Sequence, residues 1–395
     1  MRFDVRRCAL VLAIIGSTCF LPATASAAGW AQFHGRADRT GVSTTETVLT
    51  ASTAPSLHRE WAGPTGSSPD GINSSPAVWR GRVYVGSDDG ALWAFDAATG
   101  ARVWHDQVGS PIRSSPAVAS RRVFFGTEGG LVVADRAVSG ARLWSYDLGA
   151  KITASPLVVG TTVYIGSRGG ILIALNASNG DVLWSTEPFL IWGIWGGPAN
   201  ANGVIFIGSE RSEVSAYDAA TGTQLWATYL GARVRSTPSV IDGSVFVGTD
   251  AGEVAALDAS TGAVRWITAA AAPETTPVVR SSPAVADGMV FVSTAETTPM
   301  DGTAVALDEA TGAVVWRSPL ADYSTSSPAV ANGVVYVGSY DTRLYAIDEL
   351  TGTLLWAPTW GVDNLPRGIN SSPAIARGRV YIGCRDGSLY AFGES

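Results

Sequence analysis

Apolar and polar residues alternate along most of the chain in short runs that end at glycine or at Asn-Gly. The stretches RRVFFGT (121–127) and ANGVVYVGS (331–339) are typical, because their apolar side chains lead directly into a glycine. Alternation with a period of two, bounded by turn residues, is typical of β-strands. Apolar residues spaced three and four positions apart, which would indicate amphipathic helices, do not recur. The pattern therefore predicts an all-β chain.

A sequence of the type SSPAV recurs at a nearly constant period. Its proline lies at positions 76, 116, 156, 198, 238, 283, 328 and 373, with spacings of 40 to 45 residues. A period in this range indicates a repeat array or a propeller. The second repeat predicts four short strands in succession, at 114–120, 121–127, 129–135 and 139–148. Four antiparallel strands in about 40 residues form one propeller blade, so eight repeats predict an eight-bladed β-propeller.

A second motif, DxxTGxxxW, closes seven of the repeats. Its Asp or Asn can accept hydrogen bonds from its own turn, its Gly permits a positive φ, and its Trp can fill the space between neighbouring blades. The second repeat departs from the motif, with Arg136 where the others carry Asp or Asn. We expect a structural docking role for these tryptophans and for one that precedes the first repeat. They are Trp61, Trp104, Trp144, Trp184, Trp226, Trp266, Trp316 and Trp356.

The eighth repeat lacks a fourth strand, because the sequence ends there at LYAFGES. The segment SLHREWAG (56–63) precedes the first repeat, and we expect it to complete the last blade, so that the ring closes without a free sheet edge. The heptapeptide GINSSPA occurs at 71–77 and again at 368–374. The two copies then begin blades that are neighbours across the closure. The predicted divisions are an N-terminal segment at 28–56 and the propeller at 57–395.

Residues 1–27 have the pattern of an export signal. Three arginines precede an apolar run at 9–21, and small residues follow, which predicts cleavage after Ala27. The apolar run is too short for a stable membrane anchor. We therefore expect a periplasmic or secreted protein. Lipidation at Cys19 is the less favoured alternative, because Thr18 precedes it where a smaller residue is usual.

Composition and charge exclude several functions. The net charge of −7 and the pI near 5.1 argue against a nucleic-acid-binding surface. Cys384 is the only cysteine after the signal, so no intrachain disulfide can form. His34, His58 and His105 lack metal-ligand spacing and are expected at blade edges. No histidine is placed to activate the SSP serines, which are expected to cap strands. We therefore expect neither a catalytic residue nor a metal.

The residue three positions before each repeat proline should lie at the rim of a central funnel, because the first strand of a blade lines the propeller axis. The predicted ligand-binding ring is Asn73, Arg113, Thr153, Trp195, Arg235, Arg280, Thr325 and Asn370. The planar guanidinium of arginine can bind a carboxylate through two hydrogen bonds, and the face of an indole can stack on a flat ring. The ring therefore predicts a flat, anionic ligand.

A second set of residues is expected around this ring, at the ends of the second strands: Asp88, Glu128, Arg168, Glu210, Asp250, Tyr340 and Arg385. Its acids can simply neutralise the arginines, with Glu128 paired to Arg113 and Asp250 to Arg235. Long connections between blades emerge on the same face. Their aromatic and apolar residues, which either contact a partner or pack locally, are Phe189, Ile191, Trp192 and Trp360.

Eight blades with repeated DxxTGxxxW motifs resemble the PQQ-repeat propellers, a family named after pyrroloquinoline quinone (PQQ). The resemblance covers nearly the whole mature chain, and WAQFHGRADRTGVS (30–43) resembles the segment with which such proteins begin. The family includes quinoprotein alcohol dehydrogenases. It also includes non-enzymatic scaffolds such as BamB, a periplasmic lipoprotein that assists outer-membrane β-barrel assembly. The fold alone does not separate these functions.

The residues that carry dehydrogenase chemistry in this family are matched only in part. Trp195 has the position of the tryptophan that stacks beneath the quinone. The family has a metal-binding Asn at the positions that correspond to Ser209–Arg211, and this chain has no Asn there. Residues 166–170, where the family has a metal-binding acid, contain no acid. Arginine cannot ligate Ca²⁺, which requires oxygen donors. The insertion that carries the catalytic Asp and the adjacent cysteine pair are also missing.

The sequence therefore favours an exported, non-catalytic binding scaffold with a BamB-like build. We expect a monomer whose partner is a protein, a peptide or a small anionic ligand, with no transmembrane span and no nucleic acid. The alternative is a quinoprotein that binds PQQ atypically, through the carboxylate-binding side chains of Arg113, Arg235 and Arg280 and through stacking on Trp195.

Overall fold

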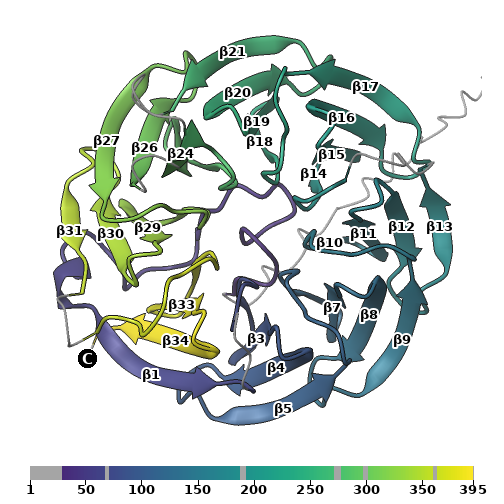
Figure 1. Ribbon diagram of the computed structural model, residues 1–395, viewed down its shortest axis with the longest axis horizontal. Helices are drawn as coiled ribbons and strands as arrows, with labels where there is room; N and C mark the ends of the chain where they lie inside the picture. The colour runs from purple at the N-terminus through teal and green to yellow at the C-terminus, as the bar shows by residue number, and fades with distance from the viewer. Residues whose placement is uncertain are drawn as a thin grey trace, which may run out of the picture.

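Eight four-stranded antiparallel sheets form a closed ring around a central axis (Figure 1). The computed structural model describes residues 29–66, 71–186, 193–270, 277–296, 301–358 and 363–394. Within these ranges the only helix is a 3-10 turn at Ala54–Ser56. The predicted eight-bladed all-β propeller is thereby confirmed.

Each blade is built from four strands in order from the axis outward, except blade 8, whose outermost strand comes from the N-terminal side of the chain. The first four blades contain β2–β5 (Ala77–Trp79, Arg82–Gly86, Ala91–Asp96, Arg102–Gln107), β6–β9 (Ala117–Ala119, Arg122–Gly126, Leu131–Arg136, Arg142–Asp147), β10–β13 (Leu157–Val159, Thr162–Gly166, Leu172–Asn176, Val182–Ser185) and β14–β17 (Ala199–Ala201, Val204–Gly208, Glu213–Asp218, Gln224–Tyr229). The last four contain β18–β21 (Ser239–Ile241, Ser244–Gly248, Glu253–Asp258, Val264–Ala269), β23, β24, β26 and β27 (Ala284–Ala286, Met289–Ser293, Gly302–Asp308, Val314–Leu320), β28–β31 (Ala329–Ala331, Val334–Gly338, Leu344–Asp348, Leu354–Trp356) and β32–β34 with β1 (Ala374–Ala376, Arg379–Gly383, Ser388–Gly393, His58–Pro64). A small extra sheet pairs β22 (Pro277–Val278) with β25 (Ala295–Glu296).

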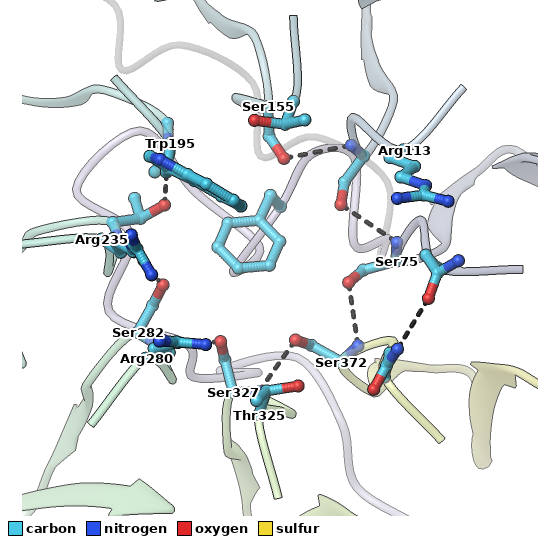
Figure 2. Close-up of a pocket in the computed structure, with 18 of the residues that line it drawn as sticks. Ser75, Arg113, Ser155, Trp195, Arg235, Arg280, Ser282, Thr325, Ser327 and Ser372 are labelled. Carbon is cyan, nitrogen blue, oxygen red and sulfur yellow. Dashed lines mark hydrogen bonds between the residues drawn. The ribbon is translucent and has the colours of Figure 1, made fainter. Parts of the chain in front are cut away.

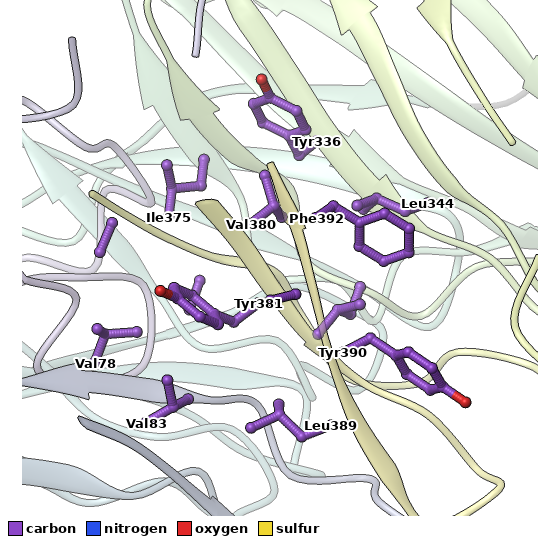
Figure 3. Close-up of a cluster of buried hydrophobic side chains, with 14 of the residues drawn as sticks. Val78, Val83, Tyr336, Leu344, Ile375, Val380, Tyr381, Leu389, Tyr390 and Phe392 are labelled. Atoms are coloured by element: carbon purple, nitrogen blue, oxygen red, sulfur yellow. The ribbon is translucent and has the colours of Figure 1, made fainter. Parts of the chain in front are cut away.

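The core lies between the blades rather than at one centre. The second and third strands of each blade are buried on both faces, because a neighbouring blade covers each side. Figure 3 shows this packing at the closure, where Val83 of blade 1 and Tyr381 of blade 8 belong to one cluster. Burial on two faces explains why these strands are nearly continuous apolar runs. The alternation with a period of two that we expected from the sequence is therefore wrong for the second strands.

The ring closes where the sequence analysis predicts. β1 pairs antiparallel with β34, so that Trp61 lies opposite Ala391 and Ala62 lies opposite Tyr390. The two GINSSPA copies meet at the same junction, where Asn370 donates from its side chain to Asn73 Oδ1 at 2.7 Å. Segments from the two ends of the chain thus become spatial neighbours, and β34 is paired on both sides.

The motif tryptophans lie against glycines of the next blade's DxxTG turn. A Cβ added to Gly100 would stand 2.5 Å from the Trp61 ring, and Gly100 has a φ of 71°. Both facts require glycine at this position. Trp104 Nε1 donates to the carbonyl of Ala137 at 3.2 Å, which ties blade 1 to blade 2. Blade 8 lacks such a turn, and there Trp356 packs edge-on against Phe392, with ring centroids 5.7 Å apart.

Residues 30–43, here called the central segment, lie in the middle of the ring (Figure 1). Backbone amides of the inner strands bond to this segment in turn around the ring. Those of Val78 and Val330 donate to the carbonyls of Trp30 and Gly41 at 2.8 and 2.9 Å. Corresponding bonds from Val118, Asn200, Val240 and Val285 reach Ala31, Ala37, Asp38 and Thr40. The central segment therefore joins blades that are far apart in the sequence.

Arg39 anchors the central segment although it is completely buried. Its guanidinium donates to the carbonyls of Pro198, Pro156 and Phe33, which belong to blade 4, blade 3 and the segment itself. Burial lowers the pKa of Arg39 to about 9. His34 is not at a blade edge, as expected from the sequence, but buried beside Arg39, whose carbonyl accepts its Nδ1 proton at 3.0 Å. Burial lowers the pKa of His34 to about 3, which keeps the imidazole neutral.

A buried ionic cluster joins blades 1 and 2. Asp135 is inaccessible to solvent and accepts from Arg142 Nε at 2.8 Å, while Arg142 also contacts Asp106 of blade 1. The other oxygen of Asp135 is buried without a hydrogen-bond partner. Burial and the neighbouring Asp106 carboxylate raise the pKa of Asp135 to about 7. Two carboxylates thus share one guanidinium, and of the three groups only the Asp135 carboxylate is fully buried.

Replacing Asp135 by Asn is expected to stabilise the propeller at alkaline pH only. Folding raises the pKa of Asp135 from 3.8 to about 7, so its protonation favours the folded state in acid and this contribution is lost as pH rises through 7. Asn does not titrate and can still accept from Arg142. We expect equal Tm values at pH 4 and a Tm about 2–4 °C higher for Asp135→Asn at pH 8. Exposed Asp147→Asn is the control, and parallel Tm curves for Asp135→Asn and the wild type would contradict the prediction.

Candidate functional site

All eight residues of the predicted ring line one cavity of about 320 Å³ on the propeller axis. Figure 2 shows Arg113, Trp195, Arg235, Arg280 and Thr325 around this cavity, here called the funnel. Each of them precedes the inner strand of its blade, and this repeated position is what brings them together. Phe33 of the central segment also lines the funnel, a contact that no repeat pattern indicates.

The second serine of each SSP motif belongs to a ring of hydrogen bonds between blades. The amide of Ser75 donates to Ser115 Oγ at 3.0 Å, and the amide of Ser372 donates to Ser75 Oγ at 2.8 Å across the closure. The other members of this ring are Ser115, Ser155, Gly197, Thr237, Ser282 and Ser327, with seven bonds among the eight blades. These hydroxyls are engaged with neighbouring backbone, which gives the serines a structural role.

Blade 4 interrupts that ring, because Gly197 has no hydroxyl to accept the amide of Ser155. A Cβ at Gly197 would stand 2.5 Å from the carbonyl oxygen of Ser155, and one at Gly196 would stand 2.5 Å from that of Ser236. The sequence Trp195-Gly196-Gly197 therefore brings blade 4 unusually close to its neighbours. The repeat departs from its own pattern at the blade that carries the funnel tryptophan.

The three arginines of the ring are paired with acids. Arg113 contacts Glu128 at 3.4 Å and Arg235 contacts Asp250 at 3.1 Å, so both pairs expected within a blade are present. Closer contacts cross between blades. Those contacts are Arg113 to Asp88 at 2.9 Å, Arg235 to Glu210 at 2.7 Å and Arg280 to Asp250 at 3.0 Å. Burial alone would raise the pKa of Glu210, but hydrogen bonds from Arg235 and nearby positive charges lower it.

Arg168 differs from these arginines in its surroundings. Its guanidinium carbon lies 3.3 Å from the centroid of the Trp195 ring, and that of Arg235 lies 4.7 Å away. Arg168 Nε is buried without a hydrogen-bond partner, and within the described residues its side chain forms no ion pair. Burial is the main cause that lowers the pKa of Arg168. The sequence placed Arg168 near the funnel, but nothing in it indicated that a cation would cover the indole.

The opposite side of the funnel is polar but largely uncharged. Asn370 donates to Tyr340 Oη at 3.2 Å, and Tyr340 stacks on Tyr323 with ring centroids 4.0 Å apart. Arg385 lies over the Tyr340 ring at 5.2 Å. The expected loop residues Phe189, Ile191, Trp192 and Trp360 lie outside the described residues. In the described part of the chain, no group of three or more His, Cys, Asp or Glu side chains could hold a metal ion.

Sequence comparison assigns this chain to a known family. A family model described as outer membrane protein assembly factor BamB matches residues 31–188, 190–297 and 275–393. The chain belongs to this PQQ-repeat family. A quinohemoprotein alcohol dehydrogenase of Comamonas testosteroni is 58% identical over 36 residues, which is 9% of this chain and 5% of that protein. The chain therefore matches only a small part of that relative's length.

Solved structures share the fold with both branches of the family. BamB from Moraxella catarrhalis superposes with a TM-score of 0.71 at 18% identity, covering 85% of this chain and 97% of that one. The quinohemoprotein alcohol dehydrogenase of Comamonas testosteroni superposes with a TM-score of 0.76 at 15% identity, covering 92% and 80%. At such identities the likeness concerns the fold alone.

Restoring the repeat consensus at Gly197 is expected to destabilise the protein. Six of the other seven blades carry Ser at this position and one carries Thr, yet a Cβ here would overlap the backbone of Ser155. We expect Gly197→Ser to lower the free energy of unfolding by about 1–3 kcal/mol. Thr237→Ser also restores the consensus and should lower it by about 0.8 kcal/mol or less, the value of one buried methyl group. Denaturant titration measures both, and equal stabilities would contradict the close approach of the blades.

Proposed function

We propose that this protein is an exported, non-catalytic binding propeller, similar in build to BamB, whose funnel holds an anionic group of a peptide or small-molecule partner. The observation that carries the proposal is Arg168, a partly buried cation without an ion pair in the described structure, lying on Trp195. Arg168 thus lies at the funnel of a chain of net charge −7 without a carboxylate in direct contact among the described residues. A partner's carboxylate would satisfy that charge.

The residues present do not fit PQQ and its calcium ion. A quinone stacked on Trp195 would have to displace the Arg168 guanidinium, which lies 3.3 Å from the ring centroid. The arginines that would bind the PQQ carboxylates already pair with Asp88, Glu210 and Asp250. Those same acids are the oxygen donors a calcium ion would need. This supports a binding function over the dehydrogenase alternative.

Export to the periplasm or beyond is part of the proposal. Its support is the signal-like pattern of residues 1–27, which lie outside the described residues. The described residues contain no helix that is long and apolar enough to cross a membrane. The family's description as an outer membrane protein assembly factor is compatible with a protein or peptide partner for this chain.

Reconstitution with PQQ and Ca²⁺ is expected to give no dye-linked alcohol oxidation. Wild-type protein should also leave the absorbance of added PQQ unchanged, because Arg168 covers Trp195. Arg168→Ala is the informative variant, since uncovering the indole should create weak quinone binding without turnover. Robust alcohol oxidation by the wild type would overturn the non-catalytic assignment.

An acidic peptide is expected to bind the funnel through Arg168. We expect tetraglutamate to bind more tightly than tetraglutamine in calorimetric titrations, with an affinity that falls as salt rises. Arg168→Gln should weaken tetraglutamate binding about tenfold, as expected for loss of a charged hydrogen bond. Arg211→Gln, which removes a half-exposed arginine outside the cavity, should leave binding unchanged. Equal binding of the two peptides would rule out an anionic ligand at this site.

A further inference from the structure

A second cavity, of about 700 Å³, lies between blades 4 and 5. Its wall is formed by Arg36–Asp38 of the central segment, by β14 and β15 of blade 4, and by two turns of blade 5. Those turns follow the inner strands, whereas the funnel residues precede them. The cavity therefore opens at the end of the propeller opposite the funnel, and the proposed function does not involve it.

Blade 4 lacks the tyrosine hydroxyl with which blades 1, 3 and 8 reach a carbonyl of the next blade. In blade 1, Arg82 and Tyr84 both donate to the carbonyl of Ala137 in blade 2. The residues of blade 4 that have the same register, Val204 and Phe206, carry no donor. The cavity beside Arg82 has a volume of only about 240 Å³. Blades 2, 5 and 6 also carry Phe at the position of Phe206, so the lost hydrogen bond accompanies the larger cavity of blade 4 and is not its sole cause.

The cavity combines an apolar floor with a charged rim. Phe206 and Val240, 1% and 3% exposed, form part of the floor together with Val204. Two arginines and three aspartates also line the cavity, so its formal charge is −1. Arg265 is engaged, since it donates to Asp258 at 2.8 Å and to the carbonyl of Gly243 at 3.0 Å.

Asp242 is the acid that remains available. It is exposed at the rim, and no cation lies within 4.0 Å of its carboxylate in the described part of the chain. The remaining acid, Asp38, accepts from the amide and hydroxyl of Thr40 and faces Arg36 at 3.8 Å. Burial and the charge of Asp242 raise the pKa of nearby Glu309, which reflects the negative potential at this rim.

We propose that this cavity is a second binding site, for a primary ammonium group carried on an apolar chain. The ammonium would pair with Asp242, while the apolar chain would lie on Val204, Phe206 and Val240. Removal of that chain from water supplies affinity, and the carboxylate supplies selection for a cation over a neutral group. Two sources share this chemistry, a free aliphatic amine and a lysine side chain of a peptide.

The test compares n-hexylamine with n-hexanol, and N-acetyl-lysine N-methylamide with its norleucine analogue, by calorimetry and ligand-observed NMR. We expect the wild type to bind at least one of the two amines about fivefold more tightly than its neutral counterpart, the size of a partly exposed ion pair. Preference for the free amine identifies a small molecule as the ligand, and preference for the lysine derivative identifies a peptide.

Asp242→Asn should abolish the preference for amines over neutral probes without disturbing the turn. The corresponding turn positions of blades 4 and 7 carry Asn202 and Asn332, both with positive φ like Asp242. Asp287→Asn, the same change in the turn of blade 6, is the matched control and should retain the preference. Val204→Arg, which recreates the bridging residue of blade 1, should weaken binding of all probes. Equal affinity for amine and neutral probes in the wild type, or an unchanged preference in Asp242→Asn, would overturn the proposal.

Discussion

The structure depends on the antiparallel pairing of β1 with β34, which turns a linear array of sheets into a ring. A blade of this kind cannot cover both of its faces alone, so each one requires a neighbour on either side. Without the closing strand, blade 8 would expose a row of unpaired backbone groups. Closure also brings Trp61 onto Gly100, the same contact that joins the other blades. Truncating a buried tryptophan costs about 3–5 kcal/mol, so these repeated contacts hold the ring together.

Function in a symmetric repeat protein is expected where the symmetry fails, and here it fails most clearly in blade 4. The sequence Trp195-Gly196-Gly197 replaces the usual pair of serines, interrupts the ring of hydrogen bonds and places an indole in the funnel. Val204 and Phe206 of the same blade line the cavity at the other end. The change at Gly197 removes a hydrogen bond that the other blades make, and polar or charged groups line both the funnel and the cavity. Such losses of structural contacts are more informative than the intact motifs.

The charges around the funnel are used mainly to join neighbouring blades. Arginines 113, 235 and 280 reach acids on neighbouring blades, so their charges hold the blades in register and are compensated. Arg168 lies on the indole of Trp195 and forms no ion pair in the described part of the chain, although Glu210 and Glu128 are near enough to act on its charge. BamB of Moraxella catarrhalis and the quinohemoprotein alcohol dehydrogenase of Comamonas testosteroni share this fold, so the proposed binding function rests on these few side chains and not on the propeller itself.

The sequence by itself determined the number of blades, their four-strand order, the closing strand and the eight residues that face the axis, because all of these follow from a period of 40 to 45 residues. A repeat places equivalent residues at equivalent points of a ring, whatever their chemistry. Only the tertiary structure decided what those residues contact. The central segment bonds to seven blades and buries Arg39 among carbonyls of blades 3 and 4, and Arg168 lies on an indole from the next blade. These contacts join residues that no period relates, and their energies depend on distance and desolvation, which a linear sequence does not contain.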